Sequence, residues 1–196
     1  MTAKPHSLKR DLTDAELLVL GLVVEMPRHG YELEHVIEQR GMREWTQIGF
    51  SSIYFVLGKL EKAKLIVAKV PAGAKAKKIY SASASGHDAL HEQTLKVLRD
   101  VRPTYSSVLL GMAHWPAMRR DEALDALQAR HSTLEKEHRR LEGVLSVQQP
   151  LPDFVEALFD NTISQLQAEL EWVERTLHRM TSKTKSSNKR KNDGKD

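Results

Sequence analysis

The sequence predicts a mainly α-helical protein with one small β-hairpin. Apolar residues recur at helical spacing through most of the 196 residues, and only the stretches 65–70 and 77–81 have strand propensity. Two long helical patterns follow, separated by Gln149-Pro150-Leu151-Pro152. With 40% hydrophobic residues the chain can bury a core, and its length suits one ordinary domain or two small ones.

The first two helices are short and apolar. Thr13-Asp14-Ala15-Glu16 has capping-box spacing, and the apolar residues that follow it cover nearly all sides of a helix, which must therefore be buried. Pro27 and Gly30 end this helix. A second helix is predicted to begin near Tyr31 and to stop at Gly41.

A third helix combines an apolar side with a polar and aromatic side. It begins around Ser51 or Ser52, whose hydroxyl groups suit an N-cap position. Glycine at position 58 lies inside this helix and costs about 1 kcal/mol relative to alanine. Ile53, Val56, Leu57 and Leu60 are expected to be buried, and Ser52, Tyr54, Phe55, Lys59 and Lys62 form the other side.

The hairpin and a connecting helix complete the N-terminal part. The two strands of the hairpin are joined by a turn over residues 71–75 that contains Gly73. Ser85 and Asp88 have capping-box spacing, and the helix that they open ends before Pro103. We place the domain boundary near Arg99, which gives a flexible segment 1–11, a domain 12–99 and a second domain 100–181.

The second domain is predicted to be an antiparallel two-helix hairpin, with helices over 118–147 and 151–180. In the first helix, leucines occupy most of the a and d positions of a heptad repeat. His131 and His138 occupy two of these positions and are interpreted as polar interruptions that fix the register. The second helix has a continuous heptad seam. The two helices together form a hairpin whose apolar faces exceed what one protomer can cover, so a homodimer is expected. The predicted interface residues are Phe159, Ile163, Leu166, Leu170, Val173 and Leu177.

The charge is distributed unevenly along the chain. Counting Lys and Arg against Asp and Glu, residues 1–90 carry a net charge of +3, residues 91–181 carry −3 and residues 182–196 carry +4. The last segment holds no apolar residue and is predicted to be a disordered basic tail. The mildly basic N-terminal domain therefore differs in character from the acidic helical domain.

Helix, helix, reading helix and basic hairpin, in this order, are typical of a winged helix-turn-helix. The chain resembles the PadR family of bacterial transcriptional regulators over roughly residues 12–95, and Glu169–Val173 resembles the family's helical dimerisation domain. It departs from the family at Ala63-Lys64, where Gly is common. The matching residues are Leu20-Gly21-Leu22, His29-Gly30-Tyr31-Glu32-Leu33, Ser52-Ile53-Tyr54, Leu57, Lys59-Leu60-Glu61, Leu65-Ile66, Lys78-Ile79-Tyr80 and Gly86.

The resemblance implies a homodimeric repressor that releases an operator when a small molecule, often phenolic or drug-like, binds. The partner is then double-stranded DNA with an inverted-repeat operator. Tyr54 either contacts DNA or packs beside the hairpin, and the lysines either contact phosphate or are solvated. The candidate DNA-binding residues are Tyr31, Ser51, Ser52, Tyr54, Lys59, Lys75, Lys77 and Lys78.

Trp115 and Trp172 are interpreted either as core aromatics of the dimer or as the lining of a pocket for a small aromatic effector. His87 and His91 have a spacing that could place two imidazoles on a metal, but no third ligand is evident, so neither a metal nor a cofactor is expected. The chain has no cysteine, which excludes thiolate zinc sites and cysteine nucleophiles.

The sequence lacks the motifs typical of enzymes and of exported or membrane proteins. No serine lies in a nucleophile elbow and no glycine motif cradles phosphate, so an enzyme is not expected. No export or membrane segment is seen, and a cytoplasmic protein is expected. The alternative to a DNA-binding regulator is a winged-helix module that binds other proteins.

Overall fold

The computed structural model describes residues 10–46, 48–49, 52–70 and 77–192, with only the backbone for 183–192. The chain divides into two units, Met1–Pro103 and Thr104–Asp196, a few residues beyond the boundary predicted near Arg99. We describe each unit by itself. No helix in the described ranges is long and apolar enough to cross a membrane.

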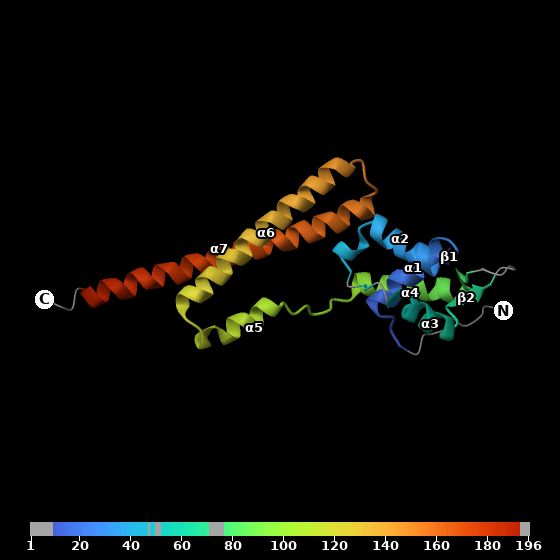
Figure 1. The fold of residues 1–196 in the computed structure, drawn as a ribbon, viewed down its shortest axis with the longest axis horizontal. Helices are drawn as coiled ribbons and strands as arrows, with labels where there is room; N and C mark the ends of the chain where they lie inside the picture. The colour runs from blue at the N-terminus through green and yellow to red at the C-terminus, as the bar shows by residue number, and fades with distance from the viewer. Residues whose placement is uncertain (1–9, 47, 50–51, 71–76, 193–196) are drawn as a thin grey trace. The chain divides into compact units, whose positions relative to one another are not determined.

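Helix α1 (Asp14–Glu25) is the centre of the first unit, as its all-round apolar sequence predicts (Figure 1). It packs against α3 (Ser52–Lys62), α4 (Ala84–Arg99) and strand β3 (Ile79–Ala82), so apolar residues on several sides of it are buried. The predicted capping box is present, because the Thr13 hydroxyl accepts from the Glu16 amide at 3.3 Å and the Glu16 carboxylate accepts from the Thr13 amide at 2.9 Å.

Helix α2 (Gly30–Gln39) and the short helix η1 (Met42–Glu44) precede α3. Gly41 lies between them with φ of 59°, the left-handed conformation expected of the predicted stop. A second left-handed residue, Lys64 with φ of 61°, ends α3, and the Leu65 amide donates to the Leu60 carbonyl at 3.0 Å. The chain therefore carries lysine at a position where glycine would relieve about 1 kcal/mol of backbone strain.

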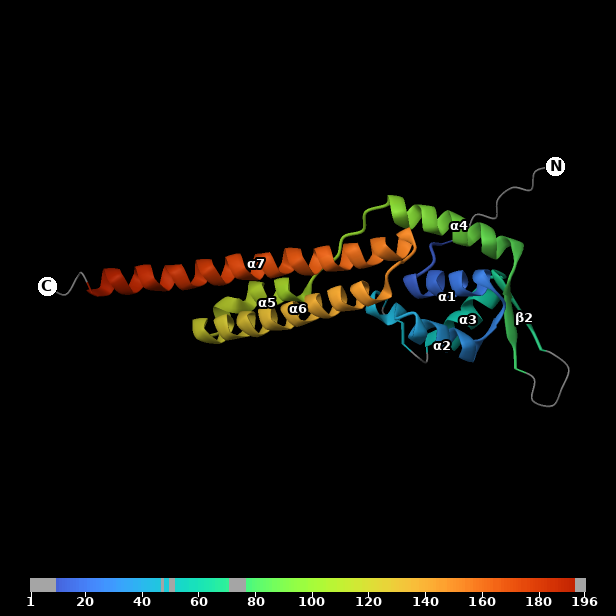
Figure 2. The same cartoon turned by 90° about the horizontal axis from the view of Figure 1, so that it is seen from above.

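The sheet has three antiparallel strands in the order β1-β3-β2. The predicted hairpin consists of β2 (Ile66–Lys69) and β3 (Ile79–Ala82), which are paired from Ile66 with Ala82 to Lys69 with Ile79. Strand β1 (Arg28–His29) pairs with β3 and was not predicted, since two residues are too short to show alternation. Figure 2 shows the hairpin beside α1 and α3. The turn residues 71–76 lie outside the described residues.

Helix α4 begins two residues earlier than the sequence predicts. Ser83, not Ser85, is the N-cap, and its hydroxyl accepts from the Gly86 amide at 3.0 Å. The same hydroxyl donates to the Lys64 carbonyl at 2.7 Å, so one serine joins the start of α4 to the end of α3. Gly86 lies against Leu65, the residue before β2, and a Cβ atom on it would be only 2.0 Å from the Leu65 carbonyl oxygen.

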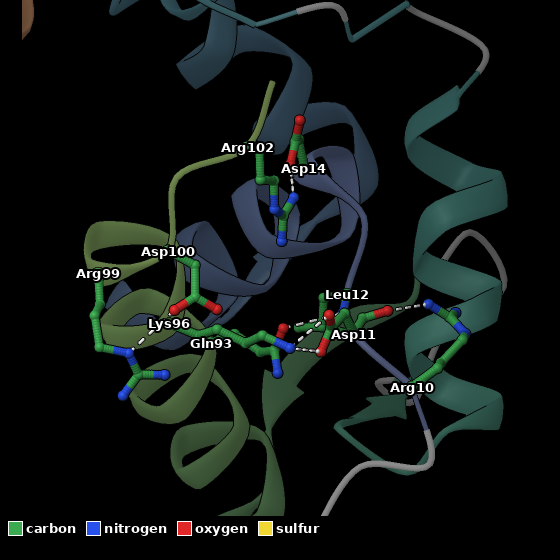
Figure 3. Close-up of polar contacts among 9 residues, drawn as sticks. All are labelled: Arg10, Asp11, Leu12, Asp14, Gln93, Lys96, Arg99, Asp100 and Arg102. Atoms are coloured by element: carbon green, nitrogen blue, oxygen red, sulfur yellow. Dashed lines mark hydrogen bonds and ion pairs between the residues drawn. The ribbon is translucent and has the colours of Figure 1, made fainter. Parts of the chain in front are cut away.

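The segment before α1 is tied to α4 and the chain that follows it (Figure 3). The buried amide oxygen of Gln93 accepts from the Leu12 amide at 3.2 Å, and Lys96 pairs with Asp11 at 2.7 Å. Arg10 binds both carboxylate oxygens of Glu16 at 2.7 Å. This hydrogen bonding lowers the pKa of Glu16, which is 1% exposed, to about 2. Arg10 and Asp11 therefore belong to the first unit, although the predicted flexible segment included them.

The second unit is a long antiparallel pair, α6 (Arg120–Gln148) and α7 (Asp153–Asn192), which lie side by side in Figures 1 and 2. Arg130 pairs with Glu169, and His131 contacts Glu174 at 3.0 Å, so a seam histidine does link the two helices. Helix α5 (Ser107–His114) and the short helix η2 (Trp115–Ala117) precede the pair and were not predicted.

Helix α7 continues to Asn192, whereas the sequence predicts a disordered tail from Ser182. No proline or glycine interrupts the chain between Met180 and Asp193, so the backbone can propagate the helix without apolar support. The arginine side chain at the start of α6, Arg120, donates to the carbonyl of Met180. The last residues of α7 therefore extend past the point where α6 begins.

Candidate nucleic-acid interface

Helix α3 presents a fixed outward side. Its apolar residues Ile53, Val56, Leu57 and Leu60 are buried in the core of the first unit, as predicted. The residues between them at helical spacing, among them Tyr54, Phe55, Lys59 and Lys62, are exposed. Because the inward side is held by packing, the outward side chains start from a rigid backbone.

Tyr54 is at the junction of α3 and α2. Its side chain is 57% exposed, yet its ring lies against the first residue of α2, since a Cβ atom on Gly30 would be 2.6 Å from Cε1 of Tyr54. Any larger residue at position 30 would therefore displace the Tyr54 ring. The Tyr54 ring therefore packs against α2, and not beside the hairpin as one interpretation of the sequence suggested. Its other edge faces solvent.

Phe55 and Lys59 form a pair one turn apart on α3. The Phe55 side chain is 65% exposed, and the ammonium group of Lys59 lies 4.5 Å from the centroid of its ring. A cation at this distance from an aromatic face is attracted by the ring quadrupole. The sequence placed Phe55 on the outward side but assigned it no role; a large apolar residue facing outward beside two lysines was the signal available.

Tyr31 connects the start of α2 to the hairpin. It is 63% exposed, and the ammonium group of Lys77 lies 5.6 Å from its ring centroid. Two residues before Tyr31, Nδ1 of His29 lies 3.0 Å from the carbonyl oxygen of Lys78, beside the pairing of β1 with β3. The base of the hairpin and the start of α2 are therefore held together, and Tyr31 and Lys77 share one surface.

The other predicted DNA-binding residues have mixed positions. Lys78 is exposed and lies 3.8 Å from the carboxylate of Glu61 at the end of α3, a solvent-exposed pair of small energy. Ser52 is half-buried at the first turn of α3. Ser51 and Lys75 lie outside the described residues. Five predicted residues, Tyr31, Tyr54, Lys59, Lys77 and Lys78, are thus described as exposed on α2, α3 and the hairpin.

Residues 19–92, which contain all of this geometry, match the family model described as the transcriptional regulator PadR-like family. The N-terminal winged-helix part of the chain is therefore PadR-like. No curated protein matches the chain by sequence.

Solved PadR structures share the fold over most of both chains. Bacillus subtilis PadR in complex with operator DNA has 20% identity and a TM-score of 0.67, and it covers 84% of this chain and 98% of its own. The same protein in complex with p-coumaric acid has 21% identity and a TM-score of 0.67, with 85% and 98% covered. A PadR-like transcriptional regulator from Bacillus cereus has 20% identity and a TM-score of 0.62, with 87% and 99% covered. The predicted fold class is therefore confirmed: a mainly helical winged-helix protein with a C-terminal helical domain.

Four of the six predicted dimer residues, Leu166, Leu170, Val173 and Leu177, already pack in the α6–α7 cluster of one protomer. Leu170 and Val173 are buried against α6, in a cluster that includes Leu127 and Leu134. Phe159, Ile163, Leu166 and Leu177 are half-buried. Part of the heptad seam therefore joins α6 to α7, and only its half-buried members retain surface for a second protomer.

Trp115 and Trp172 are both half-buried and pack against the same α6–α7 cluster. Two hollows lie elsewhere, along α2; Tyr31 and His35 line both, and Arg43, which bridges Glu34 and Glu38, lines one. Neither hollow includes a tryptophan of the second unit. Within the described ranges, no group of three or more His, Asp or Glu side chains could hold a metal ion.

Proposed function

We propose that this PadR-like protein is a homodimeric repressor that binds an inverted-repeat operator. The observation that carries the proposal is the outward side of α3, where Tyr54, Phe55 and Lys59 are exposed while the opposite side is locked into the core. A relative of the same fold, Bacillus subtilis PadR, has been solved with operator DNA. A helix with a buried back and a basic, aromatic front suits the major groove.

Two kinds of contact are expected on this surface. Lysine side chains of the hairpin supply phosphate contacts, which orient the protein without reading sequence. Side chains of α3 that reach base edges supply specificity. A dimer with two-fold symmetry presents two α3 helices, so the half-sites should be inverted and about one helical turn, or a multiple of one, apart.

Selection of bound genomic fragments, followed by footprinting, tests the proposal. We expect an enriched motif with two-fold symmetry and a footprint that covers both halves. Purified protein that enriches no fragment above input would favour the alternative, a winged-helix module that binds proteins.

Lys59 and Lys77 should differ in what they contribute. Lys59→Ala should weaken binding to the selected operator by about 1–3 kcal/mol, because it removes a charge from the reading helix. Lys77→Ala should weaken binding to every DNA duplex to a similar extent. It should also reduce the slope of log affinity against log salt concentration by about one unit, as expected for a phosphate contact. The measurement is affinity for operator and unrelated duplexes across a salt series.

Lys136→Ala on α6 is the matched control, since it removes an exposed lysine from the second unit. Tyr54→Phe keeps the ring against Gly30 and removes only the hydroxyl, so it separates packing from hydrogen bonding. Equal losses on every duplex for Lys59→Ala and Lys77→Ala would contradict the assignment of α3 to sequence reading.

A small aromatic effector should release the operator. The support is the p-coumaric acid complex of Bacillus subtilis PadR and the packing of Trp115 and Trp172 on one cluster. A coupling free energy of about 1–3 kcal/mol would suffice for a useful switch. Tryptophan fluorescence in a Trp45→Phe background, which isolates these two tryptophans, should change on addition of a phenolic acid and be accompanied by weaker operator binding. Ligands that bind without altering operator affinity would contradict this.

A further inference from the structure

Gly58 has no explanation inside the protein. It lies within α3, where glycine is unfavourable, yet a Cβ atom on it would meet nothing within 4 Å. Its φ is not positive, so no backbone conformation requires glycine. Gly111 and Gly143 are also open helical glycines, which means that open space alone does not indicate a ligand.

The neighbours of Gly58 distinguish it from those two glycines. Phe55 precedes it by three residues and Lys62 follows it by four, so all three share one side of α3. Phe55 is a large apolar side chain left in solvent, with Lys59 over its ring. The outward side of α3 thus pairs an exposed aromatic ring with a bare stretch of helix backbone.

We propose that Phe55 and Gly58 form a thymine-reading contact in the major groove. This rests on the proposed function and adds a specificity determinant to it. Gly58 lets the α3 backbone approach the base edges closely, as glycine does at other close contacts. Phe55 then places its ring against the C5-methyl group of a thymine, the apolar group that the major groove displays.

The charge on Lys59 suits this arrangement. Its ammonium group is held 4.5 Å from the Phe55 ring centroid, which keeps a cation next to the ring as the ring enters a groove lined by phosphates. Phenylalanine has no donor or acceptor, so its contribution to recognition must come from shape and apolar contact. An A·T pair whose thymine methyl faces Phe55 is the expected reading position.

The test uses a duplex selected from random-sequence DNA by the wild-type full-length protein. Replacing a contacted thymine by deoxyuridine removes only the methyl group, and we expect the wild-type affinity to fall about fourfold for each methyl lost. Phe55→Ala should bind the thymine duplex several-fold more weakly and should be indifferent to the deoxyuridine replacement. Phe55→Leu should restore part of the methyl preference.

Gly58→Ala separates this contact from a structural role. Alanine should raise the midpoint of thermal unfolding, because it favours the helix, and should lower operator affinity about tenfold or more, because its methyl group blocks the approach. Gly143→Ala on α6 is the matched control, with a similar gain in stability and unchanged operator affinity.

The outcomes are distinguishable from failure of the proposed function. If the wild type selects an operator but Gly58→Ala binds it as well as the wild type does, or Phe55→Ala retains the thymine preference, the contact is wrong and the DNA-binding function stands. If Gly143→Ala weakens binding as much as Gly58→Ala, close approach is not the cause, and the contact is also wrong. If the wild type selects no sequence, both fail, and the exposed Phe55 surface is a site for a protein partner.

Discussion

Replacing Gly86 with alanine is expected to unfold the N-terminal unit under conditions where the wild type is stable. The new Cβ atom would lie 2.0 Å from the carbonyl oxygen of Leu65 and 3.0 Å from its carbonyl carbon. Both are backbone atoms that cannot rotate away, so the start of α4 must move away from Leu65, with loss of the Ser83 cap. We expect a cost of several kcal/mol, comparable with the whole stability of a small domain. Denaturant unfolding followed by circular dichroism measures it.

Gly21→Ala is the control for this prediction. Gly21 is also helical and also part of the family match, but its Cβ atom would meet only Cδ1 of Leu90 at 3.8 Å, an ordinary contact. Alanine there should be neutral or stabilising by up to about 1 kcal/mol. If Gly86→Ala is as stable as Gly21→Ala, the close approach of Gly86 to the carbonyl group of Leu65 is wrong.

Elements with strong local signals could be predicted from the sequence. The Thr13 and Glu16 capping box, the stop at Gly41 and the amphipathic α3 each depend on side chains within one or two turns. Such signals survive folding because the local interactions that produce them are the same in the finished structure.

Elements that depend on distant residues could not be predicted. Strand β1 exists because two residues after α1 reach β3 some fifty residues later, and Ser83 caps α4 because its hydroxyl also binds the carbonyl of Lys64. No window of sequence contains both partners. The left-handed Lys64 is similar: the departure from the family pattern was visible, but the strain behind it was not.

The candidate site shows the same division. Tyr31, Tyr54, Lys59 and Lys77 were candidate DNA-binding residues, and each is exposed; their contact with DNA stays a prediction. The contact of Tyr54 with Gly30 and the pairing of Lys59 with Phe55 could not be predicted, because each depends on side-chain positions in the folded protein. The heptad seam was visible, but periodicity cannot tell whether a side chain is buried by a helix of its own chain or by a second copy.

Leu170→Glu is the substitution with the other large expected effect. Leu170 is 7% exposed and packs with Val173 against α6 within one protomer. A carboxylate there would be buried among apolar side chains without a partner, at a cost of several kcal/mol. We therefore expect α6 and α7 to separate, the proposed dimer to be lost, and operator affinity to fall far more than in Lys59→Ala, because one half-site alone binds weakly. Sedimentation and footprinting on the same samples measure both effects.

Ala168→Glu adds the same charge two residues earlier at an exposed position of α7. It should leave the helix pair folded, so a loss confined to Leu170→Glu reports burial and not charge. Because the α6–α7 pair is an intraprotomer structure, the loss of helical signal should accompany the loss of dimer in Leu170→Glu, whereas a side chain that served only the interface would give a folded monomer. A folded, helical monomer for Leu170→Glu would therefore return Leu170 to the dimer surface, and a wild-type monomer that still gives a two-fold footprint would contradict the proposed assembly itself.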